Sequence, residues 1–200
     1  MANTHHIHVF DLGNVLLFYD YAPFYKKIAG CSRRVGDLSD AVREEYRRSG
    51  IGRGGDFETF YEGVSRALSL EMSPEDFRRA WSDIFTANRP MIEIVRQAPR
   101  PRFLLSNTDA THVAWIRERF PEVFPLFDGC VFSNEVGAEK PEEAIYRRVE
   151  RLSGAPPERH VFIDDTPPFV AAARALGWRA IEFTGVEDCV RQLAAVGDRS

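Results

Sequence analysis

A short apolar run that ends in a carboxylate constrains this chain more than any other feature. Residues 7–10 combine β-branched and aromatic side chains, and Asp11 and Gly13 follow directly. A run this short predicts a buried strand rather than a helix, and Gly13 allows the backbone to turn sharply after it. Asp11 would then lie at the carboxyl edge of a sheet, where open α/β folds bind their ligands. The alternative is that Asp11 only caps a turn.

Length and composition narrow the class of protein. With 200 residues, 44% of them apolar and 12% aromatic, the chain suits one domain, or one domain with an insertion, around a substantial core. A formal net charge of −4 with interspersed acids and bases argues against a nucleic-acid partner. The apolar runs are too short for a membrane span, and the polar first residues do not resemble a signal peptide. Three separated cysteines favour reduced thiols in a cytoplasmic protein.

The segment 17–88 has a helical pattern, and no stretch of it predicts a strand. Asp56 precedes an apolar stripe at helix spacing, and Ser73 followed by Pro74 is typical of a second helix start. The glycine-rich residues 49–55 between the helices predict a flexible connector. We therefore expect a helical insertion that begins directly after the first strand.

From residue 89 onward, strands alternate with helices. Strands are expected at 102–105, 130–132, 161–163 and 178–183, and helices at 109–120, 140–152, 169–176 and 187–196. Pro141 is expected in the first turn of its helix. This alternation predicts right-handed crossovers and a parallel sheet that is covered on both faces.

Polar side chains follow four of the expected strands. The carboxyl ends of parallel strands lie along one edge of the sheet, so the following residues should meet there, with Lys140 on a nearby loop: Asp11, Ser106, Ser133, Asp164 and Asp165. Carboxylates this close raise one another's pKa unless a cation lies between them. Carboxylate oxygens and a phosphate suit Mg²⁺. The pattern predicts a magnesium site at which Asp11 stays ionised.

A small phosphorylated substrate fits this set of residues. Lys140 and the metal would neutralise the phosphoryl oxygens, and Ser106 and the backbone amide of Asn107 would donate hydrogen bonds to them. Asp11 would attack phosphorus and form an aspartyl-phosphate that water then hydrolyses. Each residue taken singly has a structural alternative: a solvated Lys140, and a helix cap at Ser106 or at the pair 164–165.

These motifs resemble those of the haloacid dehalogenase superfamily of hydrolases, and more narrowly its α-D-glucose-1-phosphate phosphatase branch. The similarity covers nearly the whole chain, with motifs at residues 10–16, 104–108, 133–141 and 161–165. It implies a Rossmann-like α/β core formed by 1–16 and 89–200, and a helical cap of the family's first type at 17–88. It also implies that the cap closes over the site and selects the leaving group.

The resemblance assigns roles to individual residues. Asp11 would be the nucleophile and a magnesium ligand, the Gly13 carbonyl a second ligand and Asp165 the third, with Asp164 supporting the metal's waters. The same resemblance implies that Ser106 and Lys140 hold the phosphate, beside the donor already expected at Asn107. Lys140 would thereby also act in catalysis. The paired acids favour phosphatases over the metal-independent dehalogenases of the superfamily.

Two positions depart from the family pattern. Phosphatases of the superfamily usually carry a second aspartate two residues after the nucleophile, as a general acid and base, and this chain has Gly13 there. Loss of a general acid costs about a hundredfold in rate, although a sugar hemiacetal leaves more readily than a plain alcohol. Four residues after the last aspartate of the pair, family members often have asparagine, and this chain has Phe169 there. These departures leave open a second interpretation, a catalytically impaired binding or regulatory protein with this fold.

Overall fold

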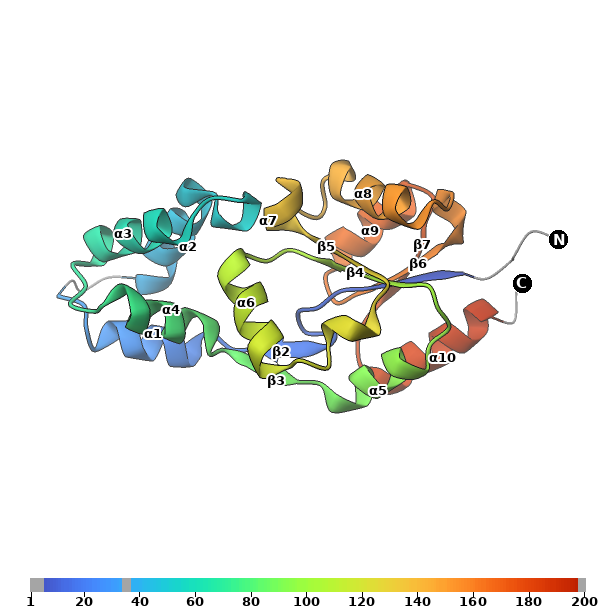
Figure 1. Cartoon of the computed structure of the whole chain (residues 1–200), viewed down its shortest axis with the longest axis horizontal. Helices are drawn as coiled ribbons and strands as arrows, with labels where there is room; N and C mark the ends of the chain where they lie inside the picture. Colours follow the sequence, from blue (N-terminus) through green and yellow to red (C-terminus); the bar gives the residue numbers. More distant parts are fainter. Residues whose placement is uncertain (1–5, 34–36, 198–200) are drawn as a thin grey trace.

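A central parallel sheet organises the protein, whose computed structural model describes residues 6–33 and 37–197. Its five strands follow the order β5-β4-β1-β6-β7 (Figure 1). Each neighbouring pair is parallel. The strands are β1 (Ile7–Phe10), β4 (Arg102–Ser106), β5 (Gly129–Phe132), β6 (His160–Asp164) and β7 (Arg179–Glu182). The predicted α/β class and parallel sheet are confirmed.

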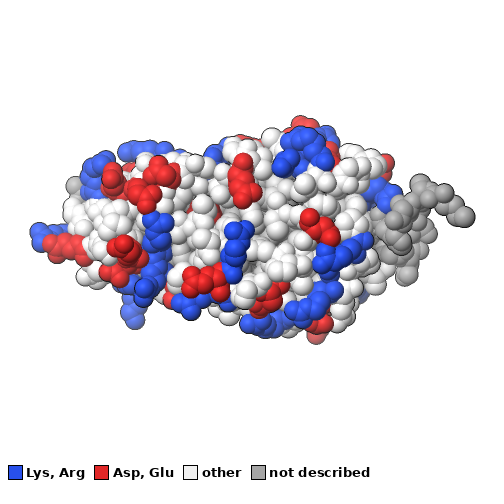
Figure 2. All heavy atoms as spheres, in the orientation of Figure 1, with Lys and Arg blue, Asp and Glu red and all other residues white. Residues whose placement is uncertain are grey.

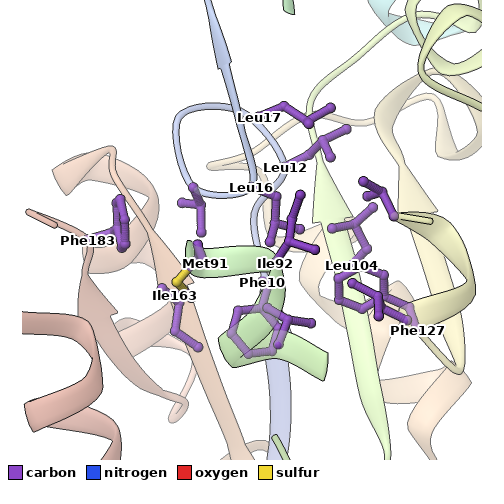
Figure 3. Close-up of a cluster of buried hydrophobic side chains, with 14 of the residues drawn as sticks. Phe10, Leu12, Leu16, Leu17, Met91, Ile92, Leu104, Phe127, Ile163 and Phe183 are labelled. Atoms are coloured by element: carbon purple, nitrogen blue, oxygen red, sulfur yellow. The ribbon is translucent and has the colours of Figure 1, made fainter. Parts of the chain in front are cut away.

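Side chains alternate between the two faces of this sheet, as the pleat of a strand requires. Val9 of β1 packs on one face, with Phe103 and Phe162 of the neighbouring strands. Phe10 packs on the opposite face, with Leu104 (Figure 3). Both faces are therefore apolar, which accounts for the near-continuous hydrophobic runs in the central strands.

Helices cover each face of the sheet. Buried residues of the first layer come from α5 (Arg89–Gln97), α6 (Ala110–Arg119) and α10 (Val186–Gly197). The opposite layer is built mainly by α8 (Glu143–Ser153) and α9 (Pro167–Ala175). Short connecting helices lie at η2 (Phe124–Leu126), α7 (Ser133–Val136) and η3 (Pro157–Arg159). The sheet is thus enclosed between two helical layers (Figure 1).

A second group of helices lies at one end of the molecule and has its own apolar cluster (Figure 1). Its elements are α1 (Ala22–Ala29), α2 (Leu38–Ser49), η1 (Ile51–Arg53), α3 (Phe57–Leu68) and α4 (Pro74–Ser82). Phe24, Phe60, Phe77 and Trp81 are buried at its centre. Asp56 and Ser73 cap α3 and α4 through their side chains, as predicted. The domain boundaries at 16/17 and 88/89 stay a prediction.

Three local predictions are wrong. The segment 17–88 contains two strands, β2 (Leu17–Tyr19) and β3 (Phe85–Ala87), which pair antiparallel because tertiary pairing selects runs too short to recognise alone. The expected connector 49–55 contains η1, whose Ile51 is buried, because this turn packs against α7. Pro141 lies before α8, which begins at Glu143, because Asn107 bonds the backbone of Lys140 and holds that loop outside the helix.

The surface carries mixed charge. Acidic and basic side chains alternate over the face drawn in Figure 2, in agreement with the net charge of −4. Within residues 6–33 and 37–197, no helix has the length and apolar character needed to cross a lipid bilayer. The absence of a nucleic-acid partner stays a prediction.

Candidate active site

The carboxyl edge of the sheet brings the predicted residues together. Asp11 directly follows β1, which lies between β4 and β6. Ser106 is the last residue of β4 and Asp164 the last of β6. The register pairs Phe10 with Leu104 and Ile163, which lie two residues and one residue before these strand ends, so Asp11 occupies the centre of the edge. Parallel pairing alone thus accounts for the convergence.

Lys140 joins two of the carboxylates. Its Nζ lies 2.7 Å from Asp11 Oδ1 and 2.6 Å from Asp164 Oδ2, and it donates a third bond of 3.2 Å to the Leu105 carbonyl. Only 1% of the Lys140 side chain is exposed. A buried ammonium that fills all three donor positions this way is held in one place. The solvated lysine that the sequence left open is therefore not observed.

Asn107 holds the backbone of the same lysine. Its Oδ1 accepts from the Lys140 amide at 2.8 Å, and its Nδ2 donates to the Lys140 carbonyl at 3.0 Å. The Asn107 side chain therefore positions Lys140, which sequence reasoning did not foresee. Because this side chain bonds Lys140, a contact between Asn107 and a substrate would come from the backbone amide. Ser106 lies beside it, buried, with Oγ 3.4 Å from the Asn107 carbonyl.

Three carboxylates form an acidic cluster. One oxygen from each of Asp11, Asp164 and Asp165 lies within 4.8 Å of the other two. Asp164 is fully buried, and its oxygens bond Lys140 and the Thr166 amide, the latter at 2.8 Å. Asp165 is less buried and accepts a 2.9 Å bond from Asn14. Asp164 is thus the most enclosed of the three carboxylates and Asp165 the least.

The cluster carries more negative than positive charge. Burial raises the pKa of Asp11, while Lys140 opposes that rise and Asp164 adds to it. Burial alone would lower the pKa of Lys140, but the carboxylates of Asp11 and Asp164 outweigh burial and raise it. A group of hard oxygen donors with this charge excess fits a small divalent cation.

Phe169 takes part in the site through its ring. The ammonium of Lys140 lies 5.1 Å from the ring centre of Phe169 and 5.5 Å from that of Phe162. Both distances allow a cation–π attraction. Where the family often has asparagine, this chain therefore has an aromatic side chain that faces the buried lysine.

Gly13 lies in the turn after Asp11, close to the linker that leads to the helical group. A Cβ atom built on Gly13 would lie 3.0 Å from Tyr19 Cε1. Asp20, which follows Tyr19, accepts a 2.8 Å bond from the Ala22 amide at the start of α1 and is exposed. Tyr19 is thus the side chain that approaches Gly13, whereas Asp20 bonds the start of α1.

Sequence reasoning missed a buried polar group between α4 and α6. Trp81 Nε1 donates to Asp109 Oδ2 at 3.1 Å, and His112 Nδ1 lies 3.1 Å from the same oxygen. The Trp81 and His112 rings stack at 5.0 Å. Asp109 also caps α6 through its other oxygen. Trp81 and Asp109 lie on distant segments of the sequence, so no local pattern indicated this bond.

Ser133 connects the helical group to the sheet edge instead of joining the acidic cluster. Its Oγ accepts from the Thr108 amide at 2.9 Å and donates to the Gly52 carbonyl at 2.7 Å. Beside it, Arg53 bonds Glu142 at 2.8 and 3.0 Å and Glu139 at 3.1 Å. The turn at η1 is therefore docked on the loop that carries Lys140.

Comparison with known proteins identifies the family. The model of the haloacid dehalogenase-like hydrolases matches residues 7–177, which include the whole acidic cluster and Lys140. The chain belongs to this family of hydrolases. The resemblance inferred from the motifs is confirmed at this level, and the glucose-1-phosphate phosphatase branch stays a prediction.

Solved structures of this family share the fold. A HAD family enzyme of Bacteroides thetaiotaomicron, solved with magnesium and inorganic phosphate, superposes with a TM-score of 0.75 at 19% identity, over 89% of this chain and 93% of that one. The L-2-haloacid dehalogenase of Xanthobacter autotrophicus gives a TM-score of 0.64 at 19% identity, over 96% of this chain and 83% of that one. Both neighbours support the fold assignment.

Similarity to curated proteins is partial. Enolase-phosphatase E1 of Streptomyces avermitilis is 35% identical over 78 residues, which are 38% of this chain and 32% of that protein. The chain spans no more than about a third of the length of the curated relatives it matches. These partial matches do not assign a substrate.

Proposed function

We propose that this hydrolase is a Mg²⁺-dependent phosphomonoesterase that acts on a small phosphorylated metabolite through an aspartyl-phosphate. The observation that carries the proposal is the position of Lys140, whose ammonium lies 2.7 Å from Asp11 and 2.6 Å from Asp164. Phosphoryl transfer needs positive charge beside the nucleophile, because the phosphoryl oxygens carry the negative charge of the reaction.

In the proposed reaction an oxygen of Asp11 attacks phosphorus in line. The bond between phosphorus and that oxygen forms as the ester bond breaks, and the electron pair of the ester bond leaves with the substrate oxygen. In this proposal Ser106 and the Asn107 amide donate hydrogen bonds to the phosphoryl oxygens, and the Lys140 ammonium supplies positive charge beside them. Water then attacks the aspartyl-phosphate, releases inorganic phosphate and regenerates the Asp11 carboxylate.

The residues for a magnesium site fit the cation. We assign Asp11, the Gly13 carbonyl and Asp165 as its protein ligands, with Asp164 in support, because the three carboxylates supply hard oxygens within 4.8 Å of one another. When bound, Mg²⁺ supplies the positive charge that offsets the carboxylates and the phosphoryl group. Support also comes from the magnesium and phosphate in the related Bacteroides enzyme.

The helical group is the proposed cap that selects the substrate. Its turn at η1 meets the Lys140 loop through Arg53 and Ser133, so it borders the proposed phosphate position. A sugar phosphate is the substrate that we propose, in line with the motif resemblance to the glucose-1-phosphate phosphatase branch. An anomeric leaving group suits a site with Gly13 in place of an acid, because such an oxygen leaves without full protonation.

Two other functions remain to be distinguished by experiment. A dehalogenase would use Asp11 without metal, and an impaired phosphatase would keep only the fold. Retention of a buried Lys140 with both of its carboxylate partners supports catalysis, because a protein that only binds partners has no need of such costly buried charges.

A substrate panel tests the proposal. Purified protein is assayed for phosphate release from sugar phosphates, alkyl phosphates and aryl phosphates, with Mg²⁺ and with a chelator, and for chloride release from 2-chloropropionate. We expect Mg²⁺-dependent phosphate release and no chloride. Chloride release without metal would support the dehalogenase, and absence of both products would support the impaired protein.

A further inference from the structure

Tyr19 fills the space above Gly13. A Cβ atom on Gly13 would lie 3.0 Å from Cε1 and 3.5 Å from Cδ1 of the tyrosine ring. Among the residues that the structure describes, no other atom outside the adjacent positions comes within 4 Å of it. The φ angle of Gly13 lies outside the left-handed region. The backbone would therefore accept another residue, and the ring of Tyr19 is the obstacle to a side chain at this position.

The turn after Asp11 places Tyr19 there. Asn14 adopts a left-handed conformation with φ of 55°, and its amide bonds the Leu17 carbonyl at 2.8 Å. This turn sends β2 back past Gly13, and Tyr19 then pairs with Phe85 of β3. Its ring also meets that of Tyr21 edge-on, at 5.8 Å. The approach to Gly13 is thus fixed by strand pairing.

The ring of Tyr19 lies beside the turn that follows Asp11 and remains accessible. A tyrosine phenol keeps its proton near neutral pH, so its hydroxyl can act as a hydrogen-bond donor. Tyr19 is 45% exposed, so a substrate in front of Asp11 can reach it.

We propose that Tyr19 is a catalytic residue that donates a hydrogen bond to the leaving oxygen of the substrate, from the space that a side chain at position 13 would occupy. The proposal rests on the proposed phosphatase function. In-line attack by Asp11 sends the ester electron pair to the oxygen on the far side of phosphorus. Tyr19 stabilises the charge on that oxygen without losing its proton, and the released oxyanion takes a proton from water.

The role predicts a dependence on the leaving group. A donated hydrogen bond matters most for a basic leaving oxygen, which carries more localised charge in the transition state. In the Mg²⁺-loaded enzyme, Tyr19→Phe should lower kcat/KM about tenfold for phenyl phosphate, the loss of one hydrogen bond, and much less for 4-nitrophenyl phosphate. Phe18→Leu, a change at the neighbouring exposed aromatic of β2, is the matched control. It should leave the ratio of kcat/KM for the two substrates at the wild-type value.

A second measurement tests the steric part without activity. Gly13→Ala should lower the thermal unfolding midpoint of the metal-free protein in the wild-type background, because its methyl group meets the ring. In a Tyr19→Ala background the same change should not lower the midpoint. An equal decrease in both backgrounds would show that Tyr19 does not occupy this space and would overturn the proposal.

The outcomes separate this proposal from the proposed function. A wild-type protein that releases phosphate from neither aryl phosphate would overturn both. An active wild type in which Tyr19→Phe lowers kcat/KM equally for both substrates, or for neither, would overturn only the role of Tyr19. A selective decrease for phenyl phosphate, with the Gly13→Ala decrease confined to the wild-type background, supports it.

Discussion

Lys140 Nζ lies 2.7 Å from Asp11 Oδ1 at the centre of the sheet edge, although 129 positions of sequence separate the two residues (140 − 11). This pair connects the first strand to the loop after β5, and Asp164 adds the end of β6. The proposed chemistry depends on this meeting point, because the ammonium offsets charge both on the nucleophile and on an incoming phosphoryl group.

Removal of the buried Lys140 ammonium should destabilise the protein strongly. Lys140→Met leaves the carboxylates of Asp11 and Asp164 buried without their partner, so we expect the free energy of unfolding to fall by about 3–5 kcal/mol. Urea unfolding in metal-free buffer measures this. Arg96→Met, which breaks the exposed pair with Glu93, is the control and should cost about 0–1 kcal/mol. Equal effects would contradict the account of Lys140.

The stability of the metal-free protein should depend on pH through Asp11. Burial raises the pKa of Asp11 from 3.8 to about 7, so between these values the folded state holds a proton that the unfolded state has lost. Stability from this group is then present at low pH and is lost as pH rises toward 7. The unfolding midpoint of the wild type, measured against that of Asp11→Asn, should fall over this window. A difference that is constant with pH would argue against the shift.

Magnesium should stabilise the folded protein. At a concentration of about 100 times its Kd, the cation would add about 2.7 kcal/mol, seen as a higher thermal midpoint. Asp165→Asn removes a proposed ligand and should abolish most of this gain. Glu93→Gln, an exposed acidic position on α5, should keep it. The metal assignment fails if Asp165→Asn responds to Mg²⁺ like the wild type.

The contact between α4 and α6 should depend on the indole donor of Trp81. Trp81→Phe removes the bond to Asp109 and leaves that buried carboxylate short of a partner, so we expect a loss of about 1–3 kcal/mol. Trp115→Phe on α6, where the indole is only partly buried, is the matched control and should cost less. Chemical denaturation of both variants gives the comparison, and equal losses would deny Trp81 a special role.

The chain order of the polar strand ends made much of the site predictable. Asp11, Ser106 and Asp164 each follow an apolar run, and parallel strands leave such residues at one edge whatever the details of packing. The chain order also placed Lys140 on a loop near this edge, but its contacts with Asp11 and Asp164 are seen only in the structure. The two-layer core followed from the alternation of strands and helices.

Other features depend on contacts between distant segments and left no local pattern. The β2–β3 pair consists of two three-residue strands, too short for periodicity to reveal. The side chain of Asn107 binds the Lys140 backbone, which no local pattern indicated, while its backbone amide stays a predicted phosphate donor. Tyr19 approaches Gly13 because Asn14 turns the chain back, which composition does not encode.

Trapping of the covalent intermediate tests the central claim most directly. The Mg²⁺-loaded protein is mixed briefly with 4-nitrophenyl phosphate, quenched in acid and digested, and the peptide that contains Asp11 is examined by mass spectrometry. We predict one added phosphoryl group on Asp11 in the wild type and none in Asp11→Asn, which should also lose phosphate release. Phosphate release that persists in Asp11→Asn, or a phosphoryl group on another residue, would contradict the account.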